Sequence, residues 1–274
     1  MSAEMEGRDA AGSFRREHEL GTQPLGDLVA LIEQTTGIDV AVLDAGPDEH
    51  GLTMRDPERG AVFIAVARTR NPMRQRSTLA HELAHVVFED WTDTANLSVN
   101  SPVESRANSF ARHLLVPVAG VKEVVGRGAI DLSTLSRVVQ RFEVSPYLAA
   151  IALEQAGYIG SATKDEWKQI ATRTLATRFG WADQYRALQA ESDQRRAPQK
   201  LLTRATTGYV ENVVSAQTIA TLRNMDVGEV ENELRTDGIE PREAGIAWAA
   251  ATDLPDSDID LGDWGDEEPE GSAG

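Results

Sequence analysis

The chain has 274 residues, enough for one large domain or two modest ones, and it contains no cysteine. The lack of cysteine excludes disulfides, thiolate metal sites and cysteine nucleophiles, so any bound metal must be held by nitrogen and oxygen. The net charge is −17, but residues 253–270 hold nine acids and no base, which leaves a net charge of −8 for the rest of the chain. This mildly acidic remainder disfavours general affinity for nucleic acid or anionic membranes.

The first twenty residues and the distribution of apolar residues bear on where the protein is located. Residues 1–20 have no apolar run, and no stretch of the chain approaches eighteen consecutive apolar residues. We therefore expect neither a secretory signal nor a membrane span, and a cytoplasmic protein. Residues 1–20 are also polar and without periodicity, which predicts a disordered N-terminal arm.

The next segment begins with a helix and two strands. Apolar residues recur at helical spacing from Leu25, and Gly37 supplies a stop for that helix. Two strand-like runs follow, at 38–43 and 61–67, and the connection between them is rich in turn-forming residues. We expect the strand at 61–67 to offer an open edge to an extended substrate.

Two further helices complete an α+β unit over residues 21–117. Asn71 and Pro72 form a helix opening, a capping side chain followed by a proline at the first helical position, and this helix should run to about residue 88. Another helix is expected over about 103–115, because Pro117 ends it.

Beyond this unit the chain is predicted to be mostly α-helical. Residues 118–160 suggest a module of short helices similar to a helix-turn-helix, and residues 161–250 suggest further polar helices. The acidic residues 251–274 are expected to form a disordered tail.

The sequence His81-Glu82-Leu83-Ala84-His85 carries the strongest chemical signal. Residues four apart project from the same face of a helix, so the imidazoles of His81 and His85 can reach one metal ion. Glu82 lies beside this pair, where it can take a proton from a metal-bound water. The pattern therefore predicts a zinc site that performs hydrolysis, with one zinc per chain.

A third protein ligand must come from elsewhere in the chain, and Glu104 and His113 are the downstream candidates. These two residues are nine positions apart, about 180° around an ideal helix, so only one of them can face the metal. We favour Glu104. Asn108 shares its face one turn later and is a candidate to hold the carboxylate in place.

These residues resemble the ImmA/IrrE metallopeptidases. The resemblance rests on HELAHVVF at 81–88 and on ESRANSFARHLLVP at 104–117, which fits the pattern E-x-x-A-N-x-F-A-x-x-L-L-x-P. It implies a zincin-like fold and activity as a zinc endopeptidase, with His81, His85 and Glu104 as zinc ligands and Glu82 as the catalytic carboxylate. It also implies a substrate class, helix-turn-helix transcriptional repressors, whose cleavage releases genes for mobile-element transfer or stress responses.

Several alternatives stay open at this stage. The protein could bind and sequester a repressor without cutting it, although a site used only for binding needs no general base such as Glu82. It could bind DNA through residues 131–159, but residues 118–160 have a net charge of zero, which disfavours a nucleic-acid interface. Two histidines and one carboxylate also suit non-haem iron or manganese.

The residue that stabilises the oxyanion of the reaction is not determined by the sequence. Four side chains are conceivable: Arg74, Arg76, His113 and Tyr147. His18 and His50 are expected to be exposed and inert, and Trp91 is expected to be core packing or the wall of a cleft.

Overall fold

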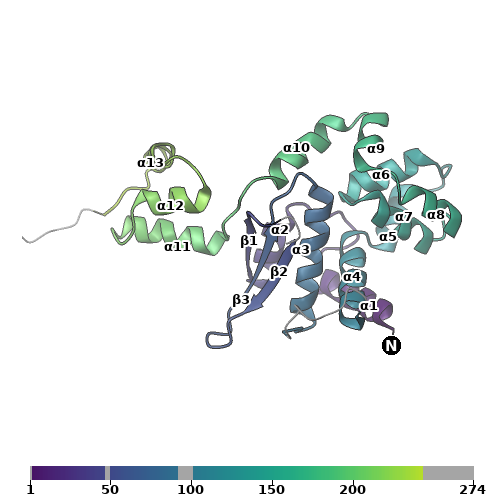
Figure 1. Cartoon of the computed structure of the whole chain (residues 1–274), viewed down its shortest axis with the longest axis horizontal. Helices are drawn as coiled ribbons and strands as arrows, with labels where there is room; N and C mark the ends of the chain where they lie inside the picture. Colours follow the sequence, from purple (N-terminus) through teal and green to yellow (C-terminus); the bar gives the residue numbers. More distant parts are fainter. Residues whose placement is uncertain (1, 47–49, 92–100, 243–274) are drawn as a thin grey trace, which may run out of the picture.

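The computed structural model describes residues 2–46, 50–91 and 101–242. Its N-terminal half contains a small sheet with helices packed on one face (Figure 1). The strands are β1 (Asp39–Leu43), β2 (Gly51–Arg55) and β3 (Val62–Ala67), in the order β1-β3-β2. β3 is parallel to β1 and antiparallel to β2. The fold class is α+β, as the sequence predicts.

The position of β3 corrects one expectation. β3 pairs with a strand on each side, so it has no open edge, and β2 is the edge strand next to it. β2 lies in the connection predicted to consist of turns. Its Leu52, Thr53, Met54 and Arg55 do alternate between apolar and polar side chains, but the strand is only five residues long and the connection around it is rich in glycine and proline. The edge available to a substrate therefore belongs to β2.

The inner face of the sheet packs against α2 (Leu28–Thr36) and α3 (Pro72–Val87) in one buried core. Alternate side chains of β1 and β3 point into this core, and they are Val40, Val42, Ile64 and Val66. α2 ends at Gly37, whose φ of 70° is left-handed, so glycine is favoured there. α3 begins as predicted, with the Asn71 side chain accepting a hydrogen bond from the Arg74 N–H at 3.2 Å.

α4 (Pro102–Leu115) packs beside α3, and α1 (Ala3–Glu17) packs against α4. The prediction of a disordered arm at 1–20 is therefore wrong. α1 buries Ala11 and Phe14, and Gly7 lies so close to α4 that a Cβ atom there would be 2.3 Å from the Arg106 carbonyl oxygen. The contact depends on small residues, which give no apolar periodicity in the sequence.

Six further helices belong to the same hydrophobic core, and the last three of them lie beyond the predicted boundary at residue 160. The six helices are α5 (Val118–Val125), α6 (Leu132–Phe142), α7 (Pro146–Gln155), α8 (Ser161–Trp167), α9 (Thr172–Arg178) and α10 (Ala182–Ser192). Trp167, Leu175 and Trp181 belong to the core that also contains the sheet residues. The Trp181 indole N–H donates to the Ser136 hydroxyl at 2.9 Å, which joins the later helices to α6.

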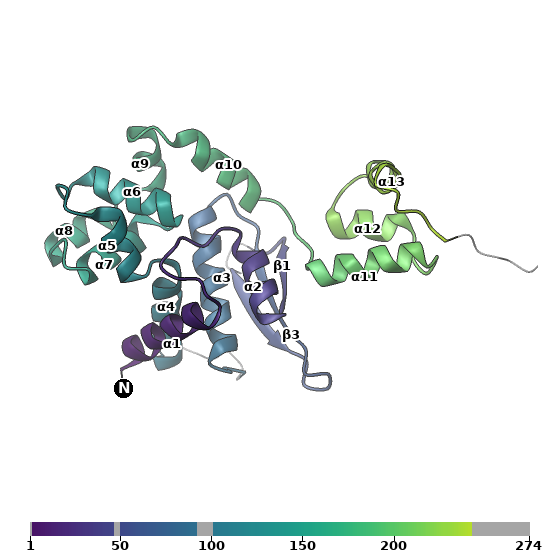
Figure 2. The same cartoon turned by 180° about the vertical axis from the view of Figure 1, so that it is seen from behind.

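The last described helices form a separate unit with its own small core. These are α11 (Gln199–Val210), α12 (Ala216–Arg223) and α13 (Val227–Thr236), packed around Ile219, Ala220 and Val230. An extended segment joins them to the rest of the molecule (Figure 2), and the start of α11 contacts α2, because the Gln199 N–H donates to Glu33 Oε1 at 3.0 Å. In that segment Arg196 pairs with Val42 of β1 through two backbone hydrogen bonds, of 2.8 and 2.9 Å.

The helices of the described residues are all too short or too polar to cross a membrane. The acidic tail expected at 251–274 lies outside the described residues.

Candidate metal site

The three residues expected to bind metal, His81, His85 and Glu104, lie together between α3 and α4. The Nε2 atom of His81 is 3.1 Å from Glu104 Oε2 and 3.1 Å from His85 Nε2. The Nε2 atom of His85 is 3.6 Å from Glu104 Oε1. One donor atom from each residue therefore lies within 4.8 Å of the other two, close enough for one ion to be bound by all three.

The helices account for this arrangement. His81 and His85 are one turn apart on α3, and their ring centroids are 4.9 Å apart with the planes at 77°. Glu104 sits in the first turn of α4, where its N–H donates to the Ser101 side chain at 3.2 Å. The cap fixes the start of α4 beside α3, so the carboxylate reaches the imidazoles.

The outer nitrogen of each imidazole faces an oxygen atom. His81 Nδ1 is 3.1 Å from Asn108 Oδ1, so Asn108 lies at the site as expected, but its hydrogen bond is to His81 rather than to the Glu104 carboxylate. His85 Nδ1 is 3.5 Å from Asp90 Oδ2. Asp90 was not identified from the sequence, because it follows the helix and has no periodic relation to the two histidines.

Glu82 is held by the edge strand. The Thr53 hydroxyl of β2 donates to Glu82 Oε2 at 2.7 Å and to the Glu82 carbonyl oxygen at 3.1 Å. β2 comes so close to α3 here that a Cβ atom at Gly51 would lie 2.6 Å from Glu82 Oε1. Glu82 is 8% exposed and still lines the clefts beside the histidines. The role of Thr53 does not follow from the sequence, because its contact depends on the position of a strand that the sequence does not predict.

Two adjoining clefts open on either side of the cluster. One has a volume of about 900 Å³, with Leu52 and Met54 of β2 and Trp91 in its wall. The other, of about 630 Å³, includes Arg74 and Tyr147. Both include His81, Glu82 and Gly51, so a groove passes the cluster along the edge of β2. Trp91 is thus a cleft wall, with the Arg55 guanidinium 5.4 Å from the centre of its ring.

The four candidates for oxyanion stabilisation divide into two pairs. Arg74 and Tyr147 line the smaller cleft, and His50, which was expected to be inert, contacts Arg74 there. Arg76 instead donates to the carbonyl oxygens of Leu25 and Gly26 and pairs with Glu143 at 3.3 Å. Burial lowers the pKa of Arg76, and the carboxylate of Glu143 opposes this shift.

His113, the rejected third ligand, is buried on the side of α4 that faces α1. Its Nε2 atom is 3.1 Å from Glu4 Oε1. Burial lowers the pKa of His113, and this outweighs the hydrogen bond to Glu4, which raises it. His113 therefore contributes to the packing of α1 and not to the metal cluster.

The donor set fits a divalent metal. Two imidazole nitrogens and one carboxylate are a usual three-residue set for a hydrolytic zinc site, which leaves a further position for water. The outer nitrogens face oxygen acceptors, which is the arrangement that aims Nε2 at a metal. An acid beside such a site, in an open groove, is suited to proton transfer during hydrolysis.

Part of the chain is similar to a known protein family. Residues 33–154 match the model of a peptidase family, M78, described as the IrrE N-terminal-like domain. No curated protein matches the chain. The matched segment runs from α2 to α7 and contains every residue of the cluster, whereas α1 and the helices from α8 onward lie outside it.

Proposed function

We propose, from the match of residues 33–154 to the IrrE N-terminal-like domain of a peptidase family, that the protein is a metallopeptidase of the ImmA/IrrE type, a zinc-dependent endopeptidase acting on a specific protein substrate in the cytoplasm. One observation carries the proposal: His81, His85 and Glu104 converge in a groove where Glu82 also lies. A fold that only binds a partner has no need of this combination of metal donors and an adjacent acid.

His81, His85 and Glu104 would hold one Zn²⁺, which supplies an activated water near neutral pH and polarises the scissile carbonyl. Glu82 accepts a proton from the attacking water and delivers it to the leaving amine. The Thr53 hydroxyl orients the Glu82 carboxylate for both transfers through its 2.7 Å hydrogen bond. Arg74 and Tyr147 are the candidates to stabilise the oxyanion, since both line the groove.

The edge of β2 is suited to binding the substrate. β2 pairs with β3 on one side, and among the described strands none pairs with its other side. An extended peptide that adds to this edge forms backbone hydrogen bonds and passes through the groove beside Glu82. Leu52 and Met54, each 45% exposed, give the cleft an apolar wall for substrate side chains.

We assign the substrate to the helix-turn-helix repressors, so that the cleavage is regulatory. The support is the family likeness of the domain that carries the site. The net charge of zero over residues 118–160 favours a protein partner over direct contact with nucleic acid.

The test is cleavage by the zinc-loaded full chain. The protein is incubated with purified helix-turn-helix repressors of its own organism, and the masses of the products are measured by mass spectrometry. We expect one repressor to be cut by the wild type and by Glu89→Gln, a control that removes a neighbouring exposed acid. Glu82→Gln should bind zinc and leave the repressor whole. A wild type that binds a repressor and never cuts it would instead indicate a sequestering regulator.

A further inference from the structure

His85 has one ring nitrogen directed at the metal cluster and the other buried against Asp90. The distance from His85 Nδ1 to Asp90 Oδ2 is 3.5 Å, and the two side chains are only 5% and 9% exposed. Neither atom has a hydrogen-bond partner among the described residues. A buried donor and a buried acceptor without other partners are costly unless they serve each other.

Metal binding determines which nitrogen of the His85 ring carries the proton. A metal held by Nε2 of His85 requires that nitrogen to be free of its proton, so the ring hydrogen resides on Nδ1. Nδ1–H then needs an acceptor, and the oxygen nearest to it in the described contacts is that of Asp90. His81 follows the same scheme, with Asn108 as the acceptor at 3.1 Å.

The end of α3 explains why Asp90 lies beside His85. The Asp90 N–H donates to the His85 carbonyl oxygen at 2.8 Å, and the Glu89 N–H donates to the Val86 carbonyl oxygen at 3.1 Å. With Glu89 at a φ of 53°, this is a Schellman turn, which folds the chain back onto the last helical turn. Such turns usually bring two apolar side chains together, whereas this one brings a carboxylate to an imidazole.

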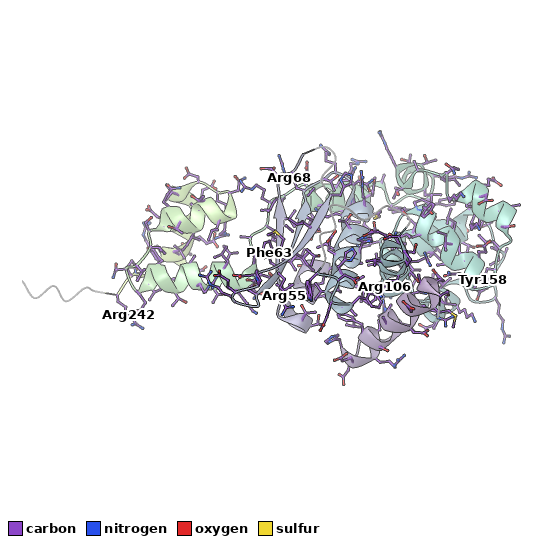
Figure 3. The ribbon with its side chains drawn as sticks, turned by 60° about the horizontal axis from the view of Figure 1, so that its bottom comes forward. Arg55, Phe63, Arg68, Arg106, Tyr158 and Arg242 are labelled. Atoms are coloured by element: carbon purple, nitrogen blue, oxygen red, sulfur yellow. The ribbon has the colours of Figure 1, made fainter. Side chains whose placement is uncertain are left out.

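Asp90 is itself held in place by α4. Arg106 forms an ion pair with Asp90 Oδ1, the oxygen that does not face His85. The guanidinium of Arg106 lies 4.4 Å from the centre of the Phe88 ring, and it is 3.8 Å from Glu6 of α1. Figure 3 shows Arg106 on α4 next to α1. The connection therefore runs from α1, outside the matched family segment, to a metal-binding histidine.

We infer that Asp90 is a positioning residue: it holds His85 in the tautomer and orientation that the metal requires, and Arg106 fixes Asp90 in turn. The inference rests on the proposed metal site. It differs from that proposal because it assigns a role to two side chains that do not touch the metal.

The experiment measures the Zn²⁺ dissociation constant of the full chain by competition with a chelating dye. Five proteins are compared: the wild type, Asp90→Ala, Asp90→Asn, Arg106→Gln and Glu89→Gln. Asp90→Ala should bind zinc about 10- to 100-fold more weakly, the usual loss when the partner of a metal-binding histidine is removed. Asp90→Asn should recover part of the loss, because its amide oxygen still accepts from Nδ1–H. Arg106→Gln should weaken binding less, and Glu89→Gln should match the wild type.

A second measurement separates positioning from general stability. Each protein is loaded with Co²⁺, and its visible absorption bands, which depend on ligand geometry, are compared with those of the wild type. The melting temperature of each metal-free protein is measured as well, to report its stability. We expect Asp90→Ala to shift the bands, and Asp90→Asn to shift them less. If Asp90→Ala does not fold, the Asp90→Asn and Arg106→Gln results decide.

Two outcomes overturn the inference while the metal site stands. In one, the Asp90 variants bind zinc as tightly as Glu89→Gln. In the other, their affinity falls only in proportion to metal-free stability, with unchanged Co²⁺ bands. A wild type that binds no zinc overturns the proposed function as well, so the two failures are distinguishable.

Discussion

Single side chains at this site owe their roles to contacts from different elements. His81 and His85 are related by helical spacing, so their shared face could be predicted from the sequence, as could the choice of Glu104 over His113. Thr53 and Asp90 could not. Thr53 reaches Glu82 through the placement of a strand, and Asp90 reaches His85 through a turn. Neither relation leaves a fixed spacing along the chain.

Thr53→Val tests the orientation of Glu82. Valine keeps the shape of threonine but removes the donor to Glu82 Oε2. A hydrogen bond to a charged group contributes about 1.5–3 kcal/mol, so we expect kcat to fall at least about tenfold. Zinc affinity should not change, because Thr53 does not belong to the donor cluster. Steady-state kinetics and zinc titration check both statements, and an unchanged kcat would refute the role of Thr53.

Glu4 joins α1 to α4 and predicts a pH dependence of stability. Partial burial raises the pKa of Glu4, but hydrogen bonds from Arg112 and His113 outweigh it and lower the pKa from 4.5 to about 2. A carboxyl with a lowered pKa stabilises the fold above its ordinary pKa, and this stabilisation is lost as the pH falls from about 4.5 through about 2.

Glu4→Gln should therefore be less stable than the wild type at pH 6, and the difference should shrink towards pH 2. The Glu4 side chain is 49% exposed, so solvent screening limits the difference to about 1 kcal/mol. Urea unfolding across this pH range measures it, with Glu17→Gln at the exposed end of α1 as the control. A difference that stays constant with pH would contradict this account.

At the scale of elements, the sequence predicts the helices and strands that have clear periodicity or strong caps. α3 and α4 begin and end within a residue or two of their expected limits, because proline and capping side chains mark their ends. α1 and β2 were missed. α1 depends on the close approach of glycine and alanine to α4, and β2 depends on pairing with β3, so both need the tertiary structure to be recognised.

Two glycines of α1 give a matched test of its packing. Alanine at Gly7 would place its Cβ 2.3 Å from the Arg106 carbonyl oxygen, whereas at Gly12 the nearest atom is the end of the Arg16 side chain at 3.4 Å. Gly7→Ala should cost about 1–3 kcal/mol of unfolding free energy through overpacking. Gly12→Ala should stabilise the protein by up to about 1 kcal/mol, because alanine favours helix. Equal effects in chemical denaturation would show that α1 is not packed on α4.

At the scale of the whole molecule, the described residues form one large core and one small one. The large core joins the sheet to the helices up to α10, and the small core belongs to α11–α13. The sequence predicts an α+β unit followed by helices, and the structure agrees. The sequence does not show where the second unit begins. The polar helices on both sides of residues 193–198 have similar patterns, and these patterns do not indicate which core each helix joins.

Two substitutions test whether the cores are independent. Ile219→Ala in the small core should cost about 2–5 kcal/mol locally and leave zinc affinity unchanged. Leu83→Ala, in the turn of α3 between the two histidines, removes an equally buried side chain from the large core and should weaken zinc binding. Zinc titration and limited proteolysis of both variants check this. Loss of zinc binding in Ile219→Ala would show that the two cores are coupled.

The most direct test of the central claim is the zinc content of the purified full chain. The wild type and Glu104→Ala are each supplied with zinc, desalted and analysed for metal per chain. We predict close to one zinc per wild-type chain and a clear loss in Glu104→Ala, because that variant lacks the only carboxylate of the three-residue donor cluster found among the described residues. A wild type that keeps no zinc after desalting would contradict the account, and a variant that keeps a full equivalent would exclude Glu104 as a ligand.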